Sequence, residues 1–256
     1  MGSAAGAASR VAEREGGSSM AAKLPVERLG DAVTRALGQR LVSLLLYGSA
    51  ARGTHVPERS DVNTLLICDA VDEALFAQLA PVMDAWLGVG RPAPLILTEA
   101  EWRSSADAFA IEYEDIREAH RVLAGRDPWR GIVVRRDDVR RQLEHELMGK
   151  VVRLRQAYAA LRRDPKQLAR VIVGNAGGFF TMLRTTLRLA GKPPSGDADA
   201  VVRAAGALVG FAPEGLAGLV AHATGGRALR LAASDPLPAA YLDAVARTAE
   251  FVNRLT

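Results

Sequence analysis

Residues 47–63 read YGSAARGTHVPERSDVN, and this stretch decides the fold. The continuous apolar run LVSLLLY at residues 41–47 leads into it and is typical of a strand buried on both faces. Gly48 and Ser49 break the strand, and a helix is predicted to start there. Because glycine lets backbone N–H groups approach a ligand and a helix N-terminus offers unpaired donors, the pattern indicates a phosphate-binding turn.

Polar side chains before and after residues 53–59 could bind a ligand at this turn. Ser49 contributes a hydroxyl and Arg52 a cation, and with Gly48 and Ser60 they form the predicted nucleotide-binding set. Asp61 opens the next predicted strand, where residues two apart share a face. An oxygen ligand at position 63 would therefore lie beside Asp61, in position to hold a divalent metal ion near bound phosphates.

The order Gly-Ser, spacer, acidic strand resembles the signature of the nucleotidyltransferase fold related to DNA polymerase beta. Minimal nucleotidyltransferases and aminoglycoside nucleotidyltransferases are the nearest resemblances, and the likeness covers about residues 29–125. It implies transfer of a nucleotide from a nucleoside triphosphate to a hydroxyl acceptor, with Mg²⁺ as cofactor and release of pyrophosphate. The sequence does not identify the acceptor or the preferred base.

The chain departs from that signature at Asn63, where the family has its second aspartate. An amide oxygen can coordinate a metal but brings no negative charge, so metal affinity and rate should fall. The family's third carboxylate lies on a later strand, and Glu112, central in the apolar stretch AFAIE, is the first choice; Asp107 and Asp115 remain open. The resemblance thus implies Asp61 and Glu112 as catalytic residues, with Asp61, Asn63 and Glu112 as metal ligands. The alternative is a catalytically inactive module of the same fold that binds nucleotide or docks a partner.

The hydrophobic pattern predicts an α+β protein with a small mixed sheet followed by an all-helical bundle. In the first part, helical spacing is expected at residues 24–37 and 71–87, and Thr98 with Glu101 fits a capping box that starts a short helix. Strands are predicted at four places, residues 41–47, 61–68, 93–97 and 109–116. The resulting domains are a nucleotidyltransferase-like domain at 24–135 and a helical domain at 136–256.

The second part shows helical periodicity only. A long helix is expected from residue 137 or 138 to 161, and Asp164-Pro165 marks the start of the next. Gly174, Gly177 and Gly178 lie inside that next helix and are interpreted as a close helix contact in preference to a ligand channel. Three further helices are predicted near residues 197–209, 213–223 and 236–255.

Composition bounds the remaining properties. The 256 residues contain 49% hydrophobic side chains, one cysteine and no apolar run of about 18 residues, which favours a cytoplasmic protein without a membrane span. Residues 1–23 are rich in Gly, Ala and Ser and are expected to form a disordered tail. Residues 135–170 carry 11 basic and 5 acidic side chains, a balance more typical of a solvated helix face than of a nucleic-acid surface.

Overall fold

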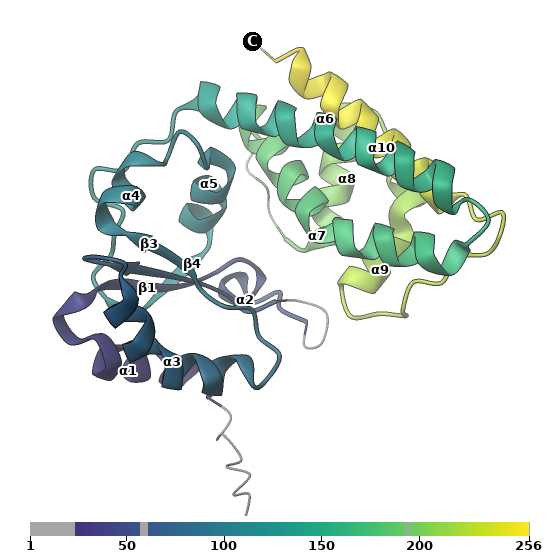
Figure 1. Cartoon of the computed structure of the whole chain (residues 1–256). Coiled ribbons are helices and arrows are strands. Elements are labelled where there is room, and N and C mark those ends of the chain that lie inside the picture. Colours follow the sequence, from purple (N-terminus) through teal and green to yellow (C-terminus); the bar gives the residue numbers. More distant parts are fainter. Residues whose placement is uncertain (1–23, 57–60, 193, 195, 256) are drawn as a thin grey trace, which may run out of the picture.

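The structure is a computed structural model that describes residues 24–56, 61–192, 194 and 196–255. The predicted tail at 1–23 lies outside this part of the chain. A four-stranded sheet and a group of long helices form two halves of the molecule (Figure 1). The α+β class expected from the sequence is therefore confirmed.

The sheet is mixed and has the order β3-β2-β1-β4. Its strands are β1 (Leu41–Tyr47), β2 (Asn63–Cys68), β3 (Leu95–Thr98) and β4 (His120–Gly125). β1 is antiparallel to both β2 and β4, whereas β2 and β3 are parallel. β1 is one of the two inner strands. The turn that follows it therefore lies at the strand ends in the middle of the sheet, away from the edge strands β3 and β4.

Helices cover both faces of the sheet, as the continuous apolar run of β1 requires. Leu44 packs with α1 (Val26–Leu37) and α3 (Glu73–Leu87), and the short helix η1 (Gly38–Arg40) links α1 to β1. Leu45 faces the other side, where α4 (Glu99–Ser104) and α5 (Ala110–Glu118) bury Trp102 and Tyr113. The capping box predicted at Thr98 and Glu101 is present at the start of α4.

The strand predicted at residues 109–116 is wrong, because this segment forms α5. Its buried side chains are spaced by three or four residues, as on one side of a helix: Ala110, Tyr113 and Ile116, with Ile111 and Asp115. The fourth strand is instead β4, which pairs with β1 from Tyr47↔His120 onward. The neighbouring strands are close to prediction, although β2 begins at Asn63 and not at Asp61.

In the described part of the second half, every regular element is a helix. It contains α6 (Arg136–Leu161), α7 (Pro165–Leu189), α8 (Ala198–Val209), η2 (Pro213–Leu216), α9 (Ala217–Ala223) and α10 (Leu237–Asn253). The predicted cap at Asp164 is confirmed, since its side chain accepts a hydrogen bond from the Gln167 N–H at 3.0 Å. These helices share one apolar core, in which the Phe179 and Tyr241 rings meet edge to face. No helix among the described residues is long and apolar enough to cross a membrane.

Candidate functional site

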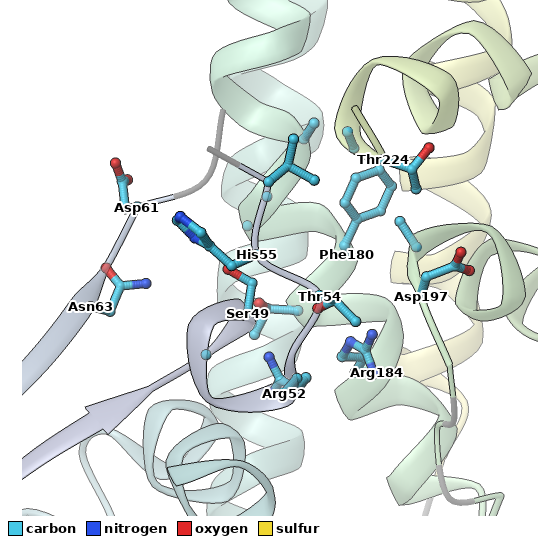
Figure 2. Close-up of a pocket in the computed structure, with 18 of the residues that line it drawn as sticks. Ser49, Arg52, Thr54, His55, Asp61, Asn63, Phe180, Arg184, Asp197 and Thr224 are labelled. Carbon is cyan, nitrogen blue, oxygen red and sulfur yellow. The ribbon is translucent and has the colours of Figure 1, made fainter. Parts of the chain in front are cut away.

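A cavity of about 770 Å³ lies between the turn after β1 and the helical half. Figure 2 shows side chains from both halves converging on it. The lining residues with chemically informative side chains or backbone are Gly48, Ser49, Arg52, Thr54, His55, Asp61, Asn63, Asp115, Gly174, Gly177, Phe180, Thr181, Arg184, Asp197, His222 and Thr224. The cavity thus contains the sequence motif, and it is completed by residues more than 100 positions further along the chain.

Gly48 forms the predicted turn at the end of β1. Its φ of 74° and ψ of −146° belong to a region that is almost reserved for glycine. The Gly48 N–H donates to the Ala119 carbonyl at 3.3 Å, which ties the turn to the segment between α5 and β4. A glycine is therefore needed here for backbone geometry, as the sequence predicted.

The helix after the turn is shorter than the phosphate-binding interpretation assumed. α2 (Ser49–Arg52) has only four residues and ends at Gly53. A single turn sums few peptide dipoles, so its contribution to anion binding is small. Ser49 remains a half-buried hydroxyl in the cavity lining.

Arg52, predicted to bind phosphate, is engaged by the protein's own carboxylates. Its Nη2 lies 2.5 Å from Asp115 Oδ1 and its Nε lies 3.7 Å from Glu118 Oε1. Only 13% of the Arg52 side chain and 12% of the Asp115 side chain are exposed. Because this pair of opposite charges is close and largely buried, much of the Arg52 charge is neutralised before a ligand arrives.

The structure separates the three candidates for the third carboxylate. Glu112, the first choice, is exposed on α5, accepts a hydrogen bond from Gln142 Nε2 at 2.8 Å and does not line the cavity. Asp107 is exposed as well and accepts from the Ala108 N–H at 2.9 Å. Asp115 does reach the cavity, but it reaches it as the partner of Arg52. The assignment of Glu112 to the site depended on the predicted strand and does not hold for a helix.

The implied magnesium ligands are only partly brought together. Asp61 and Asn63 both line the cavity, whereas Glu112 lies outside it. Across the described residues no group of three or more His, Cys, Asp or Glu side chains could hold a metal ion. One carboxylate and one amide do not form the charged clamp that two-metal transfer uses. Ser60, the remaining predicted nucleotide-binding residue, lies outside the described part of the chain.

The helical half contributes residues that the sequence motif could not reveal. Arg184 of α7 lies in the cavity lining with 8% of its side chain exposed, and its Nη2 donates to the Gly196 carbonyl at 2.8 Å. Arg188 follows one turn later and contacts Glu118. Two arginines four residues apart in the mostly buried C-terminal part of α7 were the available signal, because they must share a face.

The glycines of α7 have a different role from the predicted one. A Cβ atom added at Gly174 or Gly177 would meet nothing within 4 Å, so neither glycine mediates a close helix contact. Both are exposed and line the cavity. The close-contact interpretation is therefore wrong at these two positions, where the missing side chains leave room beside the motif.

Two further groups in or near the lining are notable for their surroundings. His55 Nδ1 is buried and has no hydrogen-bond partner among the residues that the structure describes. Burial, together with the smaller effects of the Asp115 and Glu112 carboxylates, raises the pKa of Tyr47 at the end of β1 to about 12. Tyr47 therefore stays neutral at physiological pH.

Comparison of the sequence with protein-family models and with curated proteins finds no match. The geometry of the cavity and the motif that lines it are therefore the basis for inferring a function.

Proposed function

We propose that this protein binds a nucleoside triphosphate in the cavity between its two halves. The observation that carries the proposal is that one cavity combines a glycine turn, buried arginines and an aromatic ring. Gly48, Ser49 and Arg184 contribute the polar part, and Phe180 contributes an aromatic ring (Figure 2). A nucleotide carries the matching groups, a charged phosphate tail and a flat base. The volume of about 770 Å³ falls in the range of about 300–1,000 Å³ usual for small-molecule sites.

The geometry favours binding over transfer. Asp61 shares the cavity with an amide, and Asp115, the one acidic candidate on α5 that lines the cavity, is paired with Arg52. Phosphoryl chemistry of the polymerase type needs several carboxylates around the metal ions. We therefore propose the inactive nucleotide-binding module of the nucleotidyltransferase fold as the principal function.

Calorimetric titration with ATP, CTP, GTP and UTP, each with Mg²⁺ and with a chelator, tests the proposal. Binding should persist in the chelator, because the proposed contacts come from the protein and not from a metal. Gly177→Leu should abolish binding while the protein stays folded, since the new side chain enters the cavity from a helix that accepts leucine. Gly149→Leu on α6, outside the cavity lining, is the matched control. Absence of binding to all four nucleotides would refute the proposal.

Nucleotidyl transfer to a hydroxyl acceptor with Mg²⁺ is the second candidate function. It is favoured by the presence of Ser49, Asp61 and Asn63 in one lining. The test is magnesium-dependent release of pyrophosphate from a nucleoside triphosphate, with Asp61→Asn as the inactive reference. Release that Asp61→Asn abolishes would replace the binding-module proposal with an enzyme.

A further inference from the structure

Three arginines and two carboxylates form a cluster beside the cavity, and three members of this cluster line it: Arg52, Asp115 and Arg184. Arg52 comes from α2, Arg184 and Arg188 come from α7, and Asp115 and Glu118 lie in the last turn of α5. Three positive charges thus face two negative charges at a place where little water reaches. Because arginine keeps its proton in proteins, the positive excess cannot be relieved by titration.

The two carboxylates are held in different ways. Asp115 is tightly bound, with Arg52 Nη2 at 2.5 Å and Arg188 Nη2 at 3.7 Å. Glu118 Oε1 instead lies 3.7 Å from both Arg52 Nε and Arg184 Nη1, which is beyond hydrogen-bond distance. Glu118 contacts Arg188 through its other oxygen, and 28% of its side chain is exposed. Glu118 therefore reduces the charge of Arg52 and Arg184 without using their donors.

Some N–H donors of Arg52 and Arg184 therefore have no acceptor among the described residues. Arg52 Nε is buried and has no hydrogen-bond partner among the described residues. Arg184 Nη2 donates its hydrogen bond to the Gly196 carbonyl. Burial and, to a smaller extent, the neighbouring Arg52 charge lower the pKa of Arg184. Asp197, the remaining acid near Arg184, is exposed, and its Oδ1 accepts from two backbone N–H groups at the start of α8. Buried cations with spare donors are favourable partners for an anion.

We propose that the part of the cavity lined by Arg52 and Arg184 is a phosphoryl-binding subsite. Arg184, supported by Arg52 Nε, binds the phosphate tail, and Glu118 is the counter-ion that limits its affinity. A phosphate group offers several charged oxygens, and a guanidinium can bind two of them with parallel hydrogen bonds. Arg184 and Arg52 lie in the cavity lining, whereas Glu118 and Arg188 do not. The subsite deepens the proposed function and rests on it only for the identity of the group attached to the phosphates.

Calorimetric titration with sodium tripolyphosphate at low ionic strength tests the subsite without a nucleoside. Arg184→Gln should weaken binding about tenfold or more, and Arg184→Lys, which keeps the charge but loses the paired donors, should fall between that variant and the wild-type protein. Glu118→Gln should strengthen binding, because it removes one negative charge next to both arginines. Arg247→Gln and Glu250→Gln on α10 are the matched controls, since both side chains are about half exposed or more and lie outside the cavity lining.

The outcomes separate this inference from the proposed function. If tripolyphosphate binds through Arg184 and ATP binds no more tightly, the subsite stands and the nucleotide proposal fails. If ATP binds and Arg184→Gln and Arg184→Lys, shown to be folded by circular dichroism, bind it as the wild-type protein does, the subsite is overturned. Unchanged or weaker tripolyphosphate binding by Glu118→Gln overturns its assignment as counter-ion. If the wild-type protein binds neither compound, both proposals are wrong.

Discussion

Arg52 Nη2 lies 2.5 Å from Asp115 Oδ1, and this ion pair joins the motif turn to α5. Arg188 of α7 approaches the same Asp115 oxygen at 3.7 Å, so the pair also links the sheet half to the helical half. The arginine that the sequence motif assigns to phosphate binding is therefore part of what holds the cavity walls together. A substitution of Arg52 should therefore change the stability of the fold as well as any affinity for phosphate, so stability must be measured first.

Arg52→Gln and Asp115→Asn should each lower the free energy of unfolding by about 3 kcal/mol, because each leaves a buried charge without its closest partner. The double variant should lose much less than the sum of the two, since it removes both charges. Chemical denaturation of the four proteins forms a double-mutant cycle. Arg247→Gln, whose exposed pair with Asp243 should contribute at most about 1 kcal/mol, is the control. Additive losses in the cycle would show that the pair is not coupled.

The sheet half shows where sequence patterns are sufficient and where they fail. The apolar run at 41–47 predicts a buried strand, and the structure confirms it. Between Phe109 and Ile116 the pattern fits two periods, because Phe109, Ile111 and Tyr113 alternate while Ala110, Tyr113 and Ile116 are spaced by three. The helix forms, and Phe109 is left about half exposed. The strand β4 carries no strong apolar signal and is defined by its pairing with β1, which local sequence does not encode.

Part of the candidate site was likewise predictable from local sequence, and part was not. Gly48, Ser49, Asp61 and Asn63 were predictable because they are close in sequence, at the end of β1 and around the start of β2. Arg184 and the α7 glycines reach the cavity only through the packing of the helical half against the motif. A periodicity argument places Gly177 on a helix but cannot say whether that face meets another helix or a cavity. Tertiary contact decides this, and no short-range pattern in the chain predicts it.

Gly48→Ala should destabilise the protein by about 1–3 kcal/mol, because a side chain would have to adopt a φ of 74° with an extended ψ. Gly174→Ala is the opposite control, since that glycine is helical and a Cβ would meet nothing within 4 Å. It should stabilise the protein by about 1 kcal/mol through helix propensity. Thermal unfolding of both variants tests whether Gly48→Ala lowers the stability and Gly174→Ala raises it. Equal stability of Gly48→Ala and wild type would mean that the turn relaxes to an ordinary conformation.

Cys68 makes the stability depend on pH in the alkaline range. Burial beneath α1 and α3, followed by the charge of Asp69, raises the pKa of its thiol from 9.0 to about 11. The unfolded chain therefore releases this proton before the folded chain does, so the thiol's contribution to stability is complete below pH 9 and is lost between pH 9 and 11. Cys68→Ala should remove this part of the pH dependence. In urea titrations from pH 7 to 11, the stability difference between wild type and variant should shrink as the pH rises; a constant difference would contradict the assignment.

Asn63→Asp tests how much of a metal site the cavity retains. The substitution places a second carboxylate in the lining beside Asp61. Without metal the two charges repel, and the free energy of unfolding should fall by about 1 kcal/mol or less, because Asp61 is exposed to solvent. Mg²⁺ should reverse this loss and raise the melting temperature of Asn63→Asp more than that of the wild-type protein, since a ligand that binds only the folded state stabilises it. A loss that Mg²⁺ does not reverse would show that residues 61 and 63 do not share a site.

Combining Asn63→Asp with Glu112→Gln tests whether Glu112 takes part in magnesium binding or in catalysis. Glu112 accepts its hydrogen bond from Gln142 of α6 and lies outside the cavity, so its removal should leave the response of Asn63→Asp to Mg²⁺ unchanged. For the same reason Asn63→Asp should gain magnesium affinity without gaining pyrophosphate release, because the third carboxylate of the transfer reaction is still missing. Release of pyrophosphate by Asn63→Asp that depends on Glu112 would mean that α5 rearranges to bring Glu112 into the cavity. That outcome would restore the three-carboxylate site implied by the motif and make nucleotidyl transfer the principal function.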